Sequence, residues 1–301
     1  KGVAPLVKAS ISDTQRQIAQ GLCGVERKVV LLGQLAQAHP AYSSLRALAV
    51  FIAQTSGAQL GTLADGSNAA GAWLAGVVPH RLAGGKAATA VGLDAQAMLE
   101  QPRKAYVLLG VELADFANPA QAQAALAQAE LVIALSAFAQ PLAQVVLPIA
   151  SFAESALSLV NVEGRCQTVN GATAPAGEAR PGWKVLRVLG NHFGLAGFEY
   201  VEAAQVRDEL LTACAQVQAN NLIAGEFSPY QADGLLRVGE VPCYSSDALV
   251  RRAPALQASP LGAKAVLAVN AVMAQELGLV DAGLARVRQA GGEVLLPVSV
   301  D

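Results

Sequence analysis

The stretch LVIALSAFAQPLAQVVLPI, residues 131–149, contains two short apolar runs separated by a more polar linker, in which one helical turn is expected at residues 141–144. A similar run, YVLLG, occupies residues 106–110, and an Ala-rich helix is expected at residues 119–128. Short apolar runs that alternate with helices are typical of parallel strands buried on both faces. The sequence therefore predicts an α/β fold with a doubly wound parallel sheet, covered by helices on both sides.

The same alternation extends in both directions from this stretch. Towards the N-terminus, VVLLG at residues 29–33 and a run at residues 59–63 predict two strands, and apolar residues at helical spacing predict a helix between them at 43–55. Towards the C-terminus, Pro181 and Gly194 are placed to begin and end an amphipathic helix. We expect its apolar side chains, above all Trp183 and Leu186, to anchor that helix on the sheet.

Three regions are expected along the chain. The α/β domain covers residues 1–219, a loop-rich connector covers 220–260, and a partial β-barrel-like segment covers 261–301. The last segment has a predicted strand, a short helix and two hairpin strands, at residues 265–269, 271–277, 285–289 and 293–298. Ala290-Gly291-Gly292 supplies the hairpin turn, because glycine adopts the positive φ that such turns need.

The composition excludes several classes of protein. Apolar residues make up 53% of the 301 residues and charged residues 15%, which is too apolar for a disordered chain. The formal net charge is −2 and no basic stripe is present, so nucleic acid is not expected as a partner. The uncharged residues 131–153 have the length of a membrane span, but Pro141 and Pro148 interrupt them. We expect buried strands there and no direct membrane span.

Residues able to carry redox or metal chemistry are scattered. The four cysteines are Cys23, Cys166, Cys214 and Cys243, and none lies close to another in the sequence, whereas an iron–sulfur cluster needs closely spaced thiolates. The three histidines also lack metal-ligand spacing. We therefore expect inert, buried cysteines and no catalytic, cofactor-binding or metal-binding residue in this chain.

Two local features admit a functional interpretation beside a structural one. The turn Gly66–Gly76 is the nearest approach to a nucleotide-binding loop, because exposed backbone N–H groups can face phosphate. Its spacing matches no dinucleotide fingerprint, so tight packing around Trp73 is favoured. Glu163 and Arg165 flank Gly164, a pattern that predicts either an ion pair or a capped turn.

Two motifs in fixed order carry a resemblance to a known family. The first runs VVLP at 145–148, then Glu154, then NVEGRCQ at 161–167, and the second runs GEARPGWKVL at 177–186. Their order and spacing resemble the signature of the molybdopterin oxidoreductase family. The motif residues, which we expect to act structurally, are Asn161, Glu163, Gly164, Arg165, Gly177, Arg180 and Trp183. Cys166 departs from the aromatic or aliphatic residue expected there, but its apolar character suits the same packing role.

Later segments narrow the resemblance. Residues 247–257 resemble the family's member in bacterial NADH:quinone oxidoreductase, respiratory complex I, and residues 270–298 resemble the start of the family's C-terminal barrel. The resemblance implies the third domain of the formate dehydrogenase/DMSO reductase-like fold, followed by a short, truncated β-rich segment. The chain begins with Lys1 rather than Met, as expected for a fragment or a processed form.

For function, the resemblance implies the C-terminal part of the large iron–sulfur subunit of a proton-translocating NADH:quinone oxidoreductase. It implies iron–sulfur clusters upstream of Lys1, no cofactor in this part, and a structural or assembly role. The expected partners are other subunits of the peripheral arm, and the expected location is cytoplasmic, peripheral to the inner (plasma) membrane. Two alternatives remain open: a formate dehydrogenase-like enzyme with a molybdenum- or tungsten-pterin cofactor, and a non-catalytic module that binds a nucleotide or partner through Gly66–Gly76.

Overall fold

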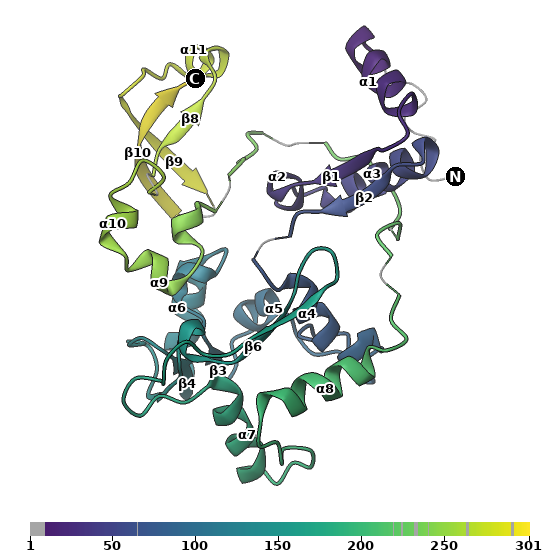
Figure 1. Cartoon of the computed structure of the whole chain (residues 1–301). Helices are drawn as coiled ribbons and strands as arrows, with labels where there is room; N and C mark the ends of the chain where they lie inside the picture. Colours follow the sequence, from purple (N-terminus) through teal and green to yellow (C-terminus); the bar gives the residue numbers. More distant parts are fainter. Residues whose placement is uncertain are drawn as a thin grey trace. The chain divides into compact units, whose positions relative to one another are not determined.

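The chain folds into two compact units, Lys1–Glu240 and Val241–Asp301. Figure 1 shows the computed structural model, which describes residues 10–64, 66–218, 220–223, 225–231, 234–239, 241–262, 265–289 and 292–301. The predicted connector at 220–260 straddles the division between the two units.

The first unit opens with a helix and a small parallel sheet. Helix α1, Asp13–Cys23, begins at a capping box in which Ser12 and Gln15 bond each other's backbone N–H groups. The elements that follow are β1 (Val29–Leu32), α2 (Gln34–Gln37), α3 (Tyr42–Ser56) and β2 (Gln59–Thr62). Strands β1 and β2 pair in parallel, and Ala49, Val50, Ala53 and Leu60 form the core between this sheet and α3. The strands and helix predicted for this region are confirmed.

Short helices connect this element to a larger sheet. They are α4 (Ala69–Ala75), the 3-10 turn η2 (Ala83–Gly85) and α5 (Ala95–Glu100). The buried Tyr106 fixes α5 to the next strand, because its hydroxyl donates a 2.8 Å hydrogen bond to Met98 O and accepts one of 2.9 Å from Arg103 N.

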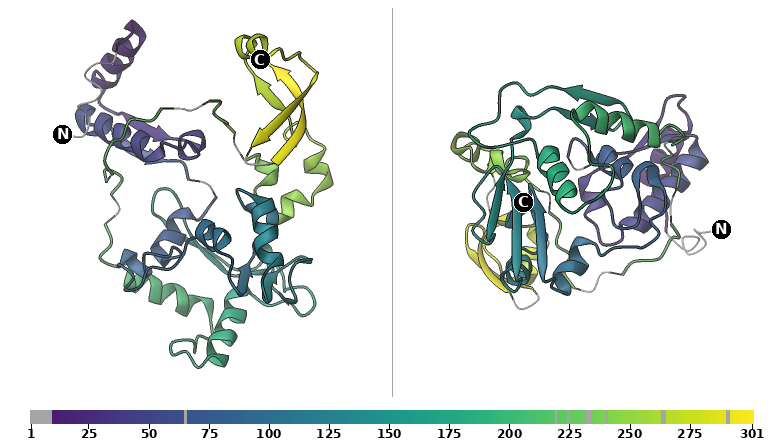
Figure 2. Two further views of the ribbon diagram at one scale, coloured as in Figure 1. Left: turned by 180° about the vertical axis from the view of Figure 1, so that it is seen from behind. Right: turned by 90° about the horizontal axis from the view of Figure 1, so that it is seen from below.

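The larger sheet has the order β3-β4-β5, and all its pairs are parallel. Its strands are β3 (Ala105–Leu109), β4 (Leu131–Ser136) and β5 (Val145–Pro148), with the turn η3 (Leu113–Asp115) and helix α6 (Pro119–Ala127) between the first two. Figure 2 shows the strands side by side. Tyr106, Leu126 and Val132 form a core on one face. Parallel pairing is thus confirmed, whereas the doubly wound arrangement stays a prediction, because large side chains on the other face of β3 remain exposed.

The linker before β5 differs in one detail from its predicted structure. Residues 141–144 form a turn rather than the expected helical turn. Gln144 is positioned by strand β4 instead: its side-chain Oε1 accepts from Val132 N at 2.6 Å, and its own N–H donates to Val132 O at 3.0 Å.

The first unit continues with a hairpin and two helices. The turn η4 (Phe152–Glu154) precedes β6 (Leu157–Val160) and β7 (Cys166–Val169), which pair in antiparallel fashion. Helices α7 (Gly182–His192) and α8 (Ala203–Ala213) follow.

The second unit is a small helix-and-sheet element. It contains η5 (Cys243–Ser245), α9 (Ala248–Arg251), α10 (Pro254–Gln257), β8 (Leu267–Val269), α11 (Ala271–Leu277), β9 (Leu284–Gln289) and β10 (Gly292–Val300). Strand β10 is central, parallel to β8 and antiparallel to β9. The predicted hairpin pairing is confirmed, while Ala290 and Gly291 of its predicted turn lie outside the described residues.

Candidate functional site

The first motif forms the β6–β7 hairpin and its loop. Asn161 closes this loop, because its Oδ1 accepts from Glu163 N at 3.0 Å and from Arg165 N at 2.9 Å. Its backbone also accepts from Gly164 N at 2.9 Å and donates to Arg165 O at 3.1 Å. Gly164 has a φ of +80°, a conformation that glycine adopts at little cost. Of the two expected arrangements for this segment, the loop therefore adopts the capped turn.

Glu154 joins the hairpin to the loop that follows it. Its Oε2 accepts from Ser151 N at 2.8 Å, and its Oε1 accepts from Ala176 N at 3.2 Å. Hydrogen bonds from the backbone and then the side chain of Ser151 lower the pKa of Glu154 below its ordinary value. Gly171 approaches the backbone of Glu154 so closely that an added Cβ would lie 2.8 Å from its carbonyl carbon. This carboxylate thus holds two loop segments rather than a substrate or metal.

The second motif continues the larger sheet. Arg180, held extended before Pro181, forms a parallel bridge to Ile149. Its carbonyl accepts from Ala150 N at 2.9 Å, and its N–H donates to Pro148 O at 3.3 Å. Gly177, which opens this motif, has a φ of +55°. The motif residues thus lie in two places, the β6–β7 loop and the edge of β5.

Helix α7 contacts the sheet differently from our expectation. Its first residue, Gly182, makes the approach, since a Cβ added there would lie 3.5 Å from Leu109 Cδ1 and 3.8 Å from Ile149 Cδ1. Trp183 is only partly buried, and the Lys184 ammonium lies 5.4 Å from the centre of its ring. The expectation that a deeply buried Trp183 anchors the helix is therefore too strong.

The turn Gly66–Gly76 is occupied by its own side chains. Asn68 Oδ1 accepts from Val160 N at 2.8 Å, which ties this turn to β6. A Cβ on Gly71 would lie 2.1 Å from that oxygen, so the glycine makes room for Asn68. Trp73 is 56% exposed and meets the His80 ring edge-on at 5.8 Å, so the predicted tight packing around Trp73 is wrong.

The cysteines do not fit an iron–sulfur cluster. Cys23 and Cys243 are exposed and Cys166 and Cys214 are half-buried, which corrects the expectation of buried residues. Within the described part of the chain, no three His, Cys, Asp or Glu side chains gather in a way that could hold a metal ion. A cluster would need several thiolates in one place.

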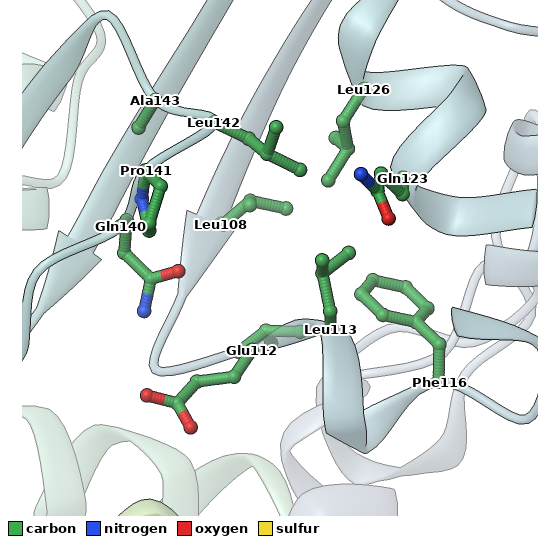
Figure 3. Close-up of a pocket in the computed structure, with 11 residues that line it drawn as sticks. Leu108, Glu112, Leu113, Phe116, Gln123, Leu126, Gln140, Pro141, Leu142 and Ala143 are labelled. Carbon is green, nitrogen blue, oxygen red and sulfur yellow. The ribbon is translucent and has the colours of Figure 1, made fainter. Parts of the chain in front are cut away.

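A cavity of about 170 Å³ lies at the carboxyl ends of β3 and β4. Figure 3 shows the side chains of Leu108, Leu126 and Leu142 converging on it. The described lining is apolar except for three residues, and consists of Leu108, Val111, Glu112, Leu113, Phe116, Gln123, Leu126, Gln140, Pro141, Leu142 and Ala143. Small-molecule pockets usually measure roughly 300–1,000 Å³. The cavity is too small for a pterin dinucleotide, and these residues offer its phosphates no cationic side chain.

Sequence reasoning missed this cavity because its residues come from four separate segments. The polar end of the cavity had a local signal in Ser136 and Gln140, four residues apart. Gln140 Nε2 donates to Ser136 Oγ at 3.2 Å, and the same oxygen accepts from Phe138 N at 3.1 Å. In the described residues, every helix is too short or too polar to traverse a bilayer.

Comparison with known proteins places these motifs in a wider context. A family model, "Molybdopterin oxidoreductase", matches residues 11–192, which is well over half of the chain. The G subunit of NADH-quinone oxidoreductase from Mycobacterium bovis is 27% identical over 341 aligned residues, covering 97% of this chain and 40% of that protein, and its counterpart from Mycobacterium tuberculosis matches equally. The mitochondrial NADH-ubiquinone oxidoreductase 78 kDa subunit of Neurospora crassa is 35% identical over 82 residues, or 27% of this chain and 11% of its own.

A solved structure shares the fold. Acetylene hydratase from Pelobacter acetylenicus matches 74% of this chain and 39% of its own with a TM-score of 0.50, at 18% identity. At that identity the match concerns the fold alone. The chain spans about two fifths of the length of the two mycobacterial relatives.

Proposed function

This chain belongs to the molybdopterin oxidoreductase family, and we propose that it is the C-terminal part of the large iron–sulfur subunit of an NADH:quinone oxidoreductase. The observation that carries the proposal is the match to the mycobacterial NADH-quinone oxidoreductase relatives along 97% of the chain. That match includes the second unit, which lies beyond the residues matched by the family model. The acetylene hydratase likeness supports only the fold.

The proposed role of these residues is structural. Their motif side chains bond to neighbouring backbone groups: Asn161 closes a loop, Glu154 joins two segments, and Arg180 extends the sheet. The cysteines do not fit an iron–sulfur cluster. We therefore assign the electron-carrying clusters, and the proton-translocating activity as a whole, to parts of the enzyme outside residues 1–301.

The proposed function also implies partners and a location. Other subunits of the peripheral arm are the expected partners, and they would hold the protein on the cytoplasmic side of the inner (plasma) membrane. The alternative of a molybdenum- or tungsten-pterin enzyme has less support, because the cavity lining does not suit a pterin dinucleotide. The nucleotide-binding alternative also has less support, because Asn68 and Gly71 give the glycine-rich turn a packing role.

Metal analysis of the full-length protein, isolated from its native membranes, separates the first two functions. We expect iron in several-fold excess over protein, with molybdenum and tungsten far below stoichiometric amounts. Stoichiometric molybdenum or tungsten would overturn the proposal.

The structural role has its own test in the exposed motif side chains. Glu163→Ala and Arg165→Ala should leave NADH:quinone reductase turnover per assembled enzyme unchanged, because the side chain of Asn161 bonds only the backbones of these two residues. Normal assembly with lost turnover in either variant would show that this loop takes part in the reaction.

A further inference from the structure

We infer that residues 220–223 and 225–231 form a strap that closes over the carboxyl end of the β1–β2 sheet and is released as one unit. Figure 2 draws this segment in green, without helix or strand. Three side chains fasten it to the sheet and α3: Asn221 of the strap, and Ser44 and Arg46 of α3. The inference concerns the first unit by itself and does not depend on the proposed function.

Asn221 satisfies the free edge of the sheet. On either side of Leu60, β2 faces β1, with Gln59 N donating to Lys28 O and Leu63 N to Leu32 O. Alternation along a parallel strand therefore turns the carbonyl of Leu60 away from β1. Asn221 Nδ2 donates to this carbonyl at 3.0 Å. The strap thereby covers an edge that would otherwise be open to another strand.

Arg46 holds the same part of the strap from α3. Its Nη2 donates to Asn221 O at 3.1 Å and its Nε to Ile223 O at 3.2 Å. A weaker contact of 3.5 Å joins its Nη1 to Thr62 Oγ1, on the last residue of β2. One guanidinium thus connects the strap, α3 and the end of the strand.

Ser44 holds the other half of the strap. Its buried hydroxyl donates to Ser228 O at 2.6 Å and accepts from Ser228 N at 3.1 Å. Two residues further on, Tyr230 meets the His39 ring edge-on at 5.3 Å. The contacts therefore run in order from the end of β2, across the first turns of α3, to the segment before that helix.

This position has a functional consequence. Open α/β sheets bind their ligands beyond the carboxyl ends of the strands, where the following helices begin. Here a segment of the same chain, distant in sequence, occupies that position through hydrogen bonds and one ring contact. Any molecule that approaches this end of the sheet must first displace the strap, so the strap acts as a fastened lid.

The test is hydrogen exchange on the 301-residue chain, read at the Ser228 amide. Arg46→Ala removes contacts to Asn221 and Ile223 but none to Ser228. If the strap opens as one unit, losing bonds worth about one typical hydrogen bond net should still speed Ser228 exchange about tenfold. Arg187→Ala is the matched control, because Arg187 Nε makes a similar 3.2 Å bond to Phe198 O elsewhere. Unchanged Ser228 exchange in Arg46→Ala would show independent contacts and overturn the strap.

A second variant and a second readout guard against general unfolding. Asn221→Ala changes an exposed residue outside every helix and strand, so it should speed Ser228 exchange while β4 amides stay protected. In a Thr62→Cys background, the same change should raise the rate of maleimide labelling at that cysteine several-fold. If neither rate rises in Asn221→Ala, the strap does not close this end of the sheet.

Discussion

Leu135 on β4 offers a sharp test of the packing of the larger sheet. Its side chain is 0% exposed, so Leu135→Ala removes buried methyl groups and leaves a cavity. Large-to-small changes of this kind cost about 2–5 kcal/mol. With β4 covered by β3 on one edge and β5 on the other, little collapse is expected, and we predict a loss of about 3 kcal/mol in the free energy of unfolding.

Leu109 provides the matched control. It lies directly opposite Leu135 in the β3–β4 register but is 48% exposed. About half of its burial is therefore at stake, and Leu109→Ala should cost only about 1 kcal/mol.

Urea unfolding followed by tryptophan fluorescence measures both variants. Trp73 and Trp183 are the two tryptophans of the chain and both lie in the first unit, so the signal reports that unit alone. The midpoint should fall about three times further for Leu135→Ala than for Leu109→Ala at an unchanged slope. Equal shifts would refute the central, fully covered position of β4.

Three further changes test the motif loops and α7. Asn161→Ala removes the acceptor of two backbone N–H groups and should cost about 1–2 kcal/mol in urea unfolding, whereas Asn161→Asp, which keeps an acceptor, should cost less. The pKa of Glu154 lies below its ordinary 4.5, so its stabilising effect is present above pH 4.5 and is lost as the pH falls through the lower folded-state pKa. The stability difference between the wild type and Glu154→Gln should therefore shrink below pH 4.5, and a difference that grows on acidification would contradict the assigned hydrogen bonds. Gly190→Ala would bring a Cβ to 2.2 Å from the Phe198 ring and should lower the melting temperature, while Gly21→Ala, in open space on α1, should not; equal effects would argue against that packing.

The strands were predictable because each is a short apolar run bounded by polar residues. VVLLG, YVLLG and LVIAL all form strands within a residue or two of the expected positions. Their pairing is also parallel, as the alternation with helices predicted.

Other elements lacked such a signal. Helix α1 has no buried residue, so it shows no core-facing pattern, and its capping box at Ser12 was the available cue. The β6–β7 hairpin has polar residues such as Ser158, Gln167 and Thr168 along its strands, so no apolar run marks it. Neither element depends on burial that the sequence displays.

The site was predictable only in its local part. The turn at Gly164 follows from Gly164 itself, since glycine adopts the positive φ found there. The strap required Ser44 and Ser228 to meet across 184 residues, and no periodicity encodes such a contact. Motif order identified the family, while the physical roles of Glu154 and Arg180 emerged only from their backbone partners.

The most direct test of the proposed function is purification of the full-length protein through an affinity tag from its native membranes, followed by assay for NADH:quinone reductase activity. The proposal predicts that the tagged protein co-migrates with this activity on a native gel, in one assembly with other subunits. Recovery of the protein as a separate species, with all NADH:quinone reductase activity elsewhere on the gel, would contradict it.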